Sequence, residues 1–462
     1  MKKHYHFIGI GGIGMGALAS LVMAQGHHAS GSDLKDSAMT QRLKEEGAKI
    51  FIGHDARNVE DADFVIFSSA VDENNPELKT ATARNIPILR RAQLLSQLMQ
   101  GHIGITVAGA HGKTTTTSMI SNLLINAGLQ PTTAVGGIIN GTTNNARLGA
   151  GRHFVAEVDE SDGSFLYFSP QYSVITNIDF EHLDYYHNWE NIIKAYREFI
   201  WKTTVDGVVI GFGDDERLMA LLKASKRNFE TYGFTKDHAV HALNIQFDHF
   251  SSRFDCIVHG KNMGPVVLNV PGQHNIANAM ACISLGLKLN IDFNVIVQNL
   301  REYKGVNRRF QTIGTVDEVL VIDDYGHHPT EILATLSAAQ KVKKNRLVVA
   351  FQPHRYTRLK SLLKEFAQSL TQCDYLIVTD VYAASEKPIE GITGARLSEE
   401  VQKISTKPVV YLEKDKIMEH LLKIVKPGDL VMTLGAGDIT KISYELVEAL
   451  KGARVMGHGS RK

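Results

Sequence analysis

The chain has 462 residues, of which 44% are hydrophobic and 21% are charged. This balance is typical of a folded protein and excludes an intrinsically disordered one, and the length predicts about three domains. The 50 lysines and arginines nearly cancel the 49 aspartates and glutamates, which leaves a formal net charge of +1. We therefore expect no general attraction to nucleic acid or to an anionic membrane surface.

The apolar stretch at residues 7–24 and the cysteines bear on the cellular compartment. The stretch follows two lysines like a signal peptide, but it contains five glycines and no small-residue cleavage site follows it. Cys256, Cys282 and Cys373 are far apart and lack the spacing of a disulfide framework or a zinc site. These features predict buried, reduced thiols and a cytoplasmic protein without a membrane anchor.

Short apolar runs alternate with helical stretches along most of the chain, which predicts repeated βα units and parallel sheets. Residues 231–270 instead show alternation with turns, which predicts an antiparallel segment. New βα series begin at residue 103 and after residue 309, so we expect domains at 1–102, 103–312 and 313–462. The expected strands are 4–8, 64–68, 103–108, 154–158, 174–177, 320–323, 346–351, 375–379 and 429–434.

A glycine-rich loop follows the first expected strand. Gly9, Gly11, Gly12 and Gly14 fit the pattern G-x-G-x-x-G, in which backbone N–H groups approach a diphosphate at a helix N-terminus. Asp33 follows at the distance where an acidic residue meets a ribose hydroxyl. The pattern is typical of a dinucleotide site, but any nucleotide diphosphate fits it, and a tight βα turn needs the same glycines.

A second glycine-bearing loop lies between the strand expected at 103–108 and a helical stretch. It comprises Gly109, Ala110, His111, Gly112, Lys113, Thr114 and Thr115. In such a loop backbone donors surround the phosphates, the lysine neutralises the β- and γ-phosphate oxygens, and the first threonine hydroxyl binds Mg²⁺. The full P-loop pattern is not met, because Val107 stands at its first glycine position. The shorter Gly-x-x-Gly-Lys-Thr-Thr form still predicts an ATP site.

Eight motifs, which include both nucleotide-phosphate loops, follow one another along the chain: HFIGIGGIGMG (6–16), GAHGKTTTT (109–117), EVDESDGSF (157–165), TNIDFEHLD (176–184), PGQHNIANA (271–279), DDYGHHPTE (323–331), FQPHRYTR (351–358) and LGAGDITKIS (434–443). With these motifs, the sequence resembles the ATP-dependent Mur ligases of peptidoglycan synthesis. Ala110 departs from the family's usual threonine, which removes a hydroxyl but no backbone donor. The family implies an N-terminal Rossmann-like nucleotide-binding domain, a central P-loop-type ATPase domain with a mainly parallel sheet, and a C-terminal Rossmann-like α/β domain that binds the amino acid.

The resemblance implies an amide ligase that uses ATP and Mg²⁺ to join L-alanine to the lactyl carboxylate of UDP-N-acetylmuramate. In the family reaction the carboxylate takes up the γ-phosphate, and the alanine amine then displaces phosphate from this acyl phosphate. Such chemistry depends on positioning and on charge neutralisation. The loop at residues 9–14 then holds the UDP diphosphate instead of NAD, with Asp33, Ser68 and Ser69 as further expected ligands.

The resemblance also assigns the catalytic and metal-binding residues. It implies Thr114, Glu157 and His182 as metal ligands, and Lys113, Glu157 and His182 as catalytic residues. The acids at 159, 160 and 162, next to Glu157, otherwise indicate a solvated loop or a helix start.

The remaining assignments lie in the last two expected domains. Asn275 is the expected adenine contact and Arg309 an ATP contact, with Asp324 near the nucleotide. Two arginines and a histidine at one strand end are suited to a carboxylate, so the expected alanine site and its two catalytic arginines are formed by Tyr325, His354, Arg355 and Arg358.

Four other functions compete with this one. A related ligase joins the same muramate nucleotide to a preformed tripeptide, but it has no need of the FQPHRYTR group that suits one small amino acid. A folylpolyglutamate synthetase shares the central phosphate loop but lacks a UDP-type N-terminal domain. An NAD-dependent dehydrogenase leaves the second loop unexplained, and a non-catalytic nucleotide-binding regulator leaves the last-domain cluster unexplained.

Overall fold

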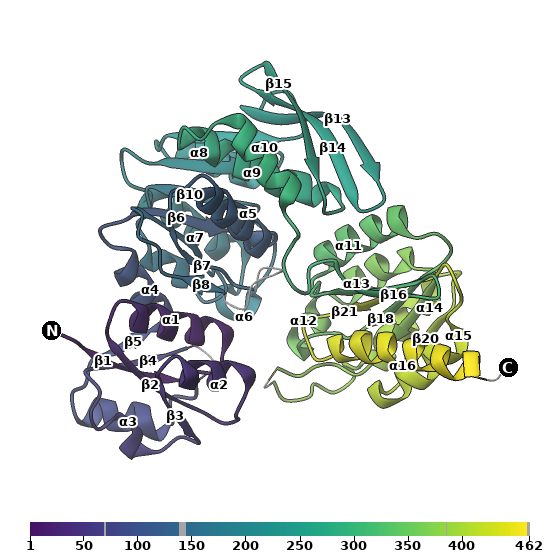
Figure 1. Ribbon diagram of the computed structural model, residues 1–462, viewed down its shortest axis with the longest axis horizontal. Helices are drawn as coiled ribbons and strands as arrows, with labels where there is room; N and C mark the ends of the chain where they lie inside the picture. Colours follow the sequence, from purple (N-terminus) through teal and green to yellow (C-terminus); the bar gives the residue numbers. More distant parts are fainter. Residues whose placement is uncertain (69–70, 138–144, 385, 460–462) are drawn as a thin grey trace. The chain divides into compact units, whose positions relative to one another are not determined.

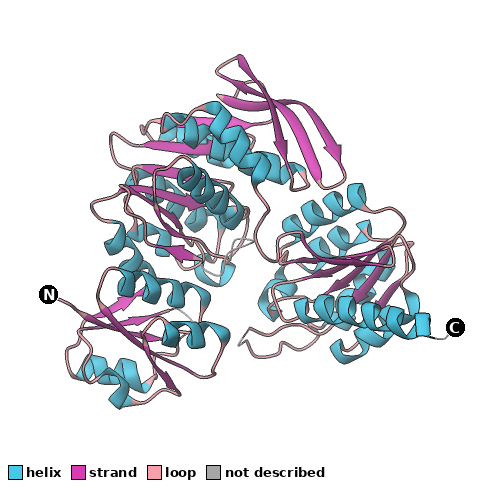
Figure 2. Ribbon diagram, in the orientation of Figure 1, coloured by secondary structure: helices cyan, strands magenta, loops and turns pink. Residues whose placement is uncertain are grey.

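The computed structural model describes residues 1–68, 71–137, 145–384 and 386–459. The chain forms two compact units, one of residues 1–243, 255–266 and 277–303 and the other of residues 244–254, 267–276 and 304–462. Three sheets with helices packed on them make up the fold (Figures 1 and 2). Each of the nine expected strands is present, with ends displaced by at most two residues.

The first sheet is fully parallel and has the strand order β3-β2-β1-β4-β5. The order reverses between β1 and β4, and ligands of open α/β sheets bind at the carboxyl ends of strands at such a switch point. The loop at Gly9 and the residue Ser68 both lie there. The elements are β1 His4–Ile8, α1 Ile13–Ala24, β2 His28–Asp33, α2 Ala38–Glu45, β3 Lys49–Ile52, β4 Phe64–Phe67, α3 Pro76–Ala83, β5 Ile88–Arg90 and α4 Arg91–Met99.

The apolar stretch at residues 7–24 consists of the last two residues of β1, the glycine-rich loop and the buried helix α1. Helix α1 packs against α2 and α4 of its own domain and against β8 of the second sheet, so nearly all of its faces are covered. This explains why the stretch lacks the amphipathic pattern of a surface helix. In the described part of the chain, no helix is long and apolar enough to cross a bilayer.

The second sheet has ten strands in the order β15-β14-β13-β12-β11-β10-β6-β9-β7-β8. In this spatial order, the seven neighbouring strands that begin with β13 and end with β7 run parallel. The segment predicted to be antiparallel forms β13 to β15, which are joined by two-residue turns. The strands are β6 Ile103–Ala108, β7 Thr132–Ala134, β8 Ala146–Arg147, β9 His153–Glu157, β10 Tyr172–Ile175, β11 Val208–Phe212, β12 Phe229–Gly233, β13 Val240–Asp248, β14 Ser251–Val258 and β15 Lys261–Leu268; the helices are α5 Lys113–Asn126, α6 Leu183–Tyr186, α7 Trp189–Lys202, α8 Glu216–Ala224, α9 Gln273–Lys288 and α10 Phe293–Glu302.

The third sheet has the order β16-β17-β21-β18-β19-β20, in which only β16 is antiparallel to its neighbour. Strands β17 and β18 end next to the two motifs expected to bind alanine. The strands are β16 Gln311–Val316, β17 Val319–Asp324, β18 Leu347–Phe351, β19 Tyr375–Val378, β20 Val409–Tyr411 and β21 Leu430–Leu434; the helices are α11 Pro329–Val342, α12 Tyr356–Ser361, α13 Leu363–Ser369, α14 Gly394–Ile404, α15 Ile417–Ile424 and α16 Thr440–Gly459.

The three cysteines are unpaired and buried, as the sequence predicts. Cys256 lies in β14 and Cys282 in α9, while Cys373 precedes β19. Burial disfavours the thiolate and raises the pKa of Cys256 and of Cys373 to about 12. None of the three therefore serves as a nucleophile at neutral pH.

Candidate active site

The first glycine loop, residues 9–14, turns tightly between β1 and α1. Gly9 has a φ of +77°, and the N–H groups of Gly9 and Ile10 both donate to the Ser32 carbonyl, at 2.8 and 3.0 Å. Gly12 stands at the N-cap of α1, and no side chain caps the first turn of this helix. The first-turn amides of α1, which no side chain caps, and the positive end of the helix dipole are suited to a phosphate group.

Three residues outside this loop are expected to bind the diphosphate with it: Asp33, Ser68 and Ser69. Asp33 ends β2, and its Oδ2 accepts a hydrogen bond from the Gly11 N–H at 2.9 Å, so this carboxylate also braces the loop. Ser68 follows β4 at the same edge of the sheet, whereas Ser69 lies outside the described residues.

The second loop, residues 109–115, is called the phosphate loop below. Gly109 has a φ of +129°, and a Cβ at this position would lie 2.1 Å from the Thr176 Oγ1. Gly112 has a φ of +80°, and its Cβ would lie 2.6 Å from the Asn278 Oδ1. Because both the backbone angle and the contacts exclude a side chain, only glycine fits at these positions.

The residues after β10 fix the phosphate loop. The Asn177 Oδ1 accepts from the His111 N–H at 2.9 Å, and the Asn177 carbonyl accepts from the Ala110 N–H at 3.2 Å. The His111 ring is held by Asp179, whose Oδ2 lies 2.8 Å from Nε2. The Ala110 side chain itself is not needed for these bonds, since the backbone makes its contact.

Lys113 begins α5, and its ammonium group points back into the loop. Nζ donates to the Gly109 carbonyl at 2.6 Å and lies 2.8 Å from the Glu160 Oε2. Burial lowers the pKa of Lys113, but Glu160, Asp159 and Glu157 outweigh it and raise the pKa above its ordinary value. The lysine is therefore a fixed positive charge at the mouth of the loop.

Glu157 and Glu160 place two carboxylates beside Lys113. The Glu157 Oε1 accepts from the Thr114 Oγ1 at 2.9 Å, and its Oε2 accepts from the Gly136 N–H at 2.7 Å. The alternative interpretation of the acids after Glu157 as a solvated loop does not fit Glu160, which is only 3% exposed. The ion pair with Lys113 is the reason that this acid tolerates burial.

Glu160, Glu181 and His182 form an acid–histidine cluster whose ligand atoms lie within 4.8 Å of one another. The His182 Nε2 is 3.3 Å from the Glu160 Oε1 and 3.7 Å from the Glu181 Oε2. Burial lowers the pKa of His182, but Glu160 and Glu181 outweigh it and raise the pKa. Hard carboxylate oxygens fit Mg²⁺, so both this cluster and the Thr114–Glu157 pair are suited to a divalent cation.

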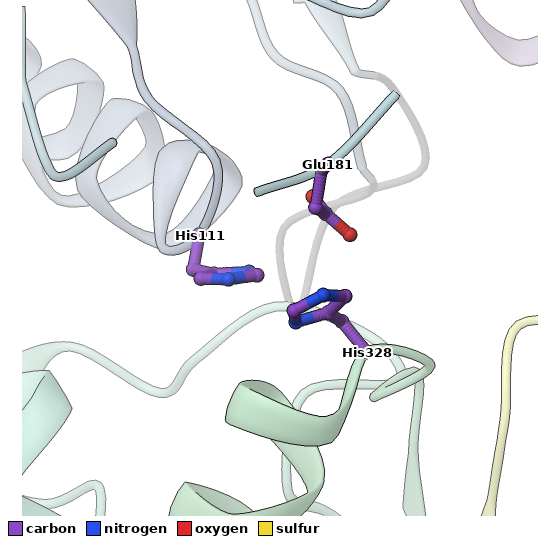
Figure 3. A group of neighbouring side chains, drawn as sticks. All are labelled: His111, Glu181 and His328. Carbon is purple, nitrogen blue, oxygen red and sulfur yellow. The ribbon is translucent and has the colours of Figure 1, made fainter. Parts of the chain in front are cut away.

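Figure 3 draws three side chains: Glu181 of this cluster, His111 of the phosphate loop and His328 of the C-terminal unit. His111 projects from the phosphate loop, and Glu181 projects from the segment between β10 and α6. His328 caps α11 in the C-terminal unit, where its Nδ1 accepts a hydrogen bond from the Thr330 N–H.

In the C-terminal unit, the expected nucleotide ligands have partners of their own. The Asn275 Nδ2 donates to the Pro271 carbonyl at 2.7 Å. The Asp324 carboxylate accepts from the N–H groups of Phe310 and Gly326, at 2.7 and 2.8 Å, and burial raises its pKa to about 6. Asp324 thus ties the start of this domain to the end of β17.

Two consecutive arginines flank the Tyr325 ring. The Arg308 guanidinium lies 4.9 Å from the ring centroid, pairs with Asp323 at 3.2 Å and donates to the Gly435 carbonyl at 2.7 Å. The Arg309 guanidinium lies 5.1 Å from the same centroid. Arg308 is thus bound inside the domain on several sides.

Three of the four expected alanine ligands come together at the ends of β17 and β18. The Arg358 Nη1 lies 3.3 Å from the His354 Nδ1, and the His354 ring stacks on Tyr382 with centroids 5.6 Å apart. His327 connects His354 to Tyr325 through ring contacts of 5.7 and 5.3 Å. Burial and the surrounding cations lower the pKa of His354 to about 3, so this imidazole is neutral.

His274, at the start of α9, makes the stability of this unit dependent on pH. Burial and the neighbouring Arg309 lower its pKa to about 4, against a small opposing effect of Glu331. Below pH 6.5 the unfolded chain binds a proton that the folded chain rejects, so stability is lost as the pH falls from 6.5 towards 4.

Between pH 7 and pH 5, we expect the free energy of unfolding to fall in both proteins. The fall should be about 1 to 2 kcal/mol smaller in the His274→Gln variant than in the wild type. Thermal unfolding of both proteins at several pH values measures this difference. Parallel pH profiles would show that the histidine has no such effect.

Three profiles of one protein family match the chain in succession. They describe the Mur ligase family catalytic domain (residues 4–103), the Mur ligase middle domain (107–286) and the Mur ligase glutamate ligase domain (308–437). The chain therefore belongs to the Mur ligase family, and the predicted three-domain α/β fold is confirmed. The exact domain boundaries at 102 and 312 stay predictions.

Individual ligases are similar to this chain over nearly its whole length. The UDP-N-acetylmuramate–L-alanine ligase of Geotalea uraniireducens (strain Rf4) is 45% identical over 448 residues, which cover 97% of this chain and 98% of that protein. The crystal structure of UDP-N-acetylmuramate-alanine ligase from Thermotoga maritima matches with a TM-score of 0.83 and 31% identity, over 98% of this chain and 100% of that one. A murein peptide ligase from Psychrobacter arcticus matches with a TM-score of 0.71 and 25% identity, over 97% and 98%.

Proposed function

We propose that this enzyme joins L-alanine to the lactyl carboxylate of UDP-N-acetylmuramate at the expense of ATP, in the cytoplasmic synthesis of peptidoglycan precursors. The observation that carries the proposal is the 45% identity, over 97% of the chain, to a ligase of that name. The carboxylate attacks the γ-phosphate of ATP to form an acyl phosphate, and ADP leaves. The amine then adds to the acyl carbon, and the tetrahedral intermediate expels phosphate.

The phosphate loop binds ATP in this scheme. Its backbone amides surround the phosphates, and the Lys113 ammonium neutralises charge on the β- and γ-phosphate oxygens. Thr114 with Glu157, and His182 with Glu160, would hold Mg²⁺, which neutralises further negative charge when bound. The family resemblance assigns Asn275 to the adenine, and Arg309 and Asp324 to the nucleotide.

The loop at residues 9–14 binds the UDP diphosphate, with Asp33, Ser68 and Ser69 as further ligands. The amides at the start of α1 are the donors that a diphosphate needs, and the glycines let it approach the backbone. The lactyl end of the bound nucleotide then faces the second sheet, where the phosphate loop lies in the same compact unit.

The cluster at the ends of β17 and β18 binds alanine. Arg355 and Arg358 hold the amino-acid carboxylate, since a planar guanidinium binds a carboxylate through two hydrogen bonds. Tyr325 and His354 form the side wall. Because His354 is neutral, it offers a polar surface that does not repel the alanine ammonium group.

Phosphate release tests the proposal. Purified enzyme receives ATP, Mg²⁺ and UDP-N-acetylmuramate, with each single amino acid or with the murein tripeptide. We expect release that depends on alanine. Release only with the tripeptide would assign the enzyme to the murein peptide ligases, and NADH production without ATP turnover would exclude both ligases.

We expect Arg358→Ala to raise the KM for alanine by about 10- to 100-fold, because one charge-assisted contact to the carboxylate is lost. The KM for ATP stays unchanged. Steady-state kinetics with each substrate varied in turn measure the two constants, and Arg396→Ala, on the surface of α14, is the control. A variant that loses only ATP affinity would contradict the alanine assignment.

A further inference from the structure

Arg91 begins helix α4 and lies against the first turn of α1. A Cβ built on Gly14 would lie 3.2 Å from the Arg91 Cδ and 3.3 Å from its Nη1. The last glycine of the G-x-G-x-x-G pattern therefore leaves room for an arginine side chain that arrives from a different βα unit. The arginine side chain therefore lies beside the last residue of the loop expected to bind the diphosphate.

The Arg91 guanidinium lacks a partner of its own. Within the described ranges, it has neither a hydrogen bond nor an ion pair, although the side chain is partly buried. Residues 69–70 and 138–144, which fall outside these ranges, contain no acid. An anion bound between this guanidinium and the N-terminus of α1 would be stabilised by the positive charge on both sides.

The charge of Arg91 also reaches the second sheet. Burial raises the pKa of Asp159, but Lys113, the Ser161 amide and Arg91 outweigh it and lower the pKa overall. Helix α4 is anchored on that side, because the Ser96 hydroxyl donates to the Tyr167 carbonyl at 2.8 Å. Arg91 thus lies against Gly14, and its charge also acts on one acid near the phosphate loop.

We propose that Arg91 is a substrate-binding residue that holds the diphosphate of the UDP-linked substrate against the N-terminus of α1. This inference rests on the proposed function. The guanidinium provides a bidentate contact from the side of the diphosphate opposite to the loop amides. By holding the diphosphate there, it sets the direction in which the lactyl carboxylate extends towards Lys113.

Binding measurements on the full-length enzyme test the inference. Calorimetry measures the affinity of the wild type and of Arg91→Ala for UDP-N-acetylmuramate and for UDP-N-acetylglucosamine, which lacks the lactyl acid. We expect both affinities to fall by the same factor, roughly 10- to 100-fold, while ATP affinity is unchanged. Arg91→Lys recovers part of the loss, since it restores the charge without the planar fork.

Arg90 offers a matched control. It directly precedes Arg91, but its guanidinium is exposed and lies 5.8 Å from the centroid of the Phe67 ring. Arg90→Ala keeps wild-type affinities. If Arg91→Ala keeps them too, the inference is wrong. If it weakens only the ligand with the lactyl acid, Arg91 binds that carboxylate and the diphosphate assignment is wrong. If the wild type binds neither nucleotide, the proposed function fails instead.

Discussion

Replacing Lys113 by alanine is expected to lower turnover by at least about 10³-fold while the UDP-linked substrate still binds. The ammonium group is the positive charge held at the phosphate loop, where it contacts the Gly109 carbonyl and Glu160. Without it, the charge that develops during phosphoryl transfer lacks its fixed counterion. Alanine-dependent phosphate release measures turnover, and calorimetry with UDP-N-acetylmuramate measures binding.

The same substitution leaves Glu160 buried without its ion pair, so loss of folding must be distinguished from loss of catalysis. Lys113→Met keeps most of the side-chain volume and removes only the charge. Circular dichroism and the thermal midpoint report on folding in both variants. Turnover near the wild-type value in a folded variant would contradict the assignment of the phosphate loop.

Replacing Glu160 by glutamine is expected to lower turnover by about 10- to 100-fold and to raise the Mg²⁺ concentration needed for half-maximal activity. This carboxylate faces both Lys113 and His182, at 2.8 and 3.3 Å. A neutral amide keeps its shape but weakens the attraction for a cation. Phosphate release over a series of Mg²⁺ concentrations measures both effects.

Asp162 offers the comparison for Glu160. It belongs to the same run of acids, but its Oδ1 accepts from the Ser164 N–H at 3.0 Å and serves the local turn. Asp162→Asn is therefore expected to keep the wild-type dependence on Mg²⁺. If Glu160→Gln lowers only the thermal midpoint and leaves this dependence unchanged, the carboxylate has a structural role alone.

The sequence predicts the sheets well because their signals are local. Apolar runs that end in glycine-rich loops mark β1 and β6, and the structure places both loops at the carboxyl ends of these strands. The phosphate loop illustrates the same point: Gly109 and Gly112 both adopt a positive φ that glycine alone accepts without strain. The predicted function came from the motifs, because they resemble those of the Mur ligases.

Contacts between distant segments are harder to predict. Glu160 follows Glu157 in an acidic run that resembles a surface loop, and only the position of Lys113, 47 residues earlier, makes it a buried acid. Arg91 resembles an ordinary helix start until its side chain is seen to pass Gly14. In both cases the sequence gives the residue type, but the partner comes from another βα unit. The roles of the remaining site residues stay predictions.

The burial of all three cysteines has a practical consequence for spectroscopy. Thiols shielded from solvent and held protonated react slowly with maleimides and iodoacetamides. The native enzyme thus provides an almost silent background for site-directed labelling. A pair of cysteines introduced at exposed positions, one in each compact unit, would carry a donor and an acceptor dye, and energy transfer between them would follow domain motion as each substrate is added.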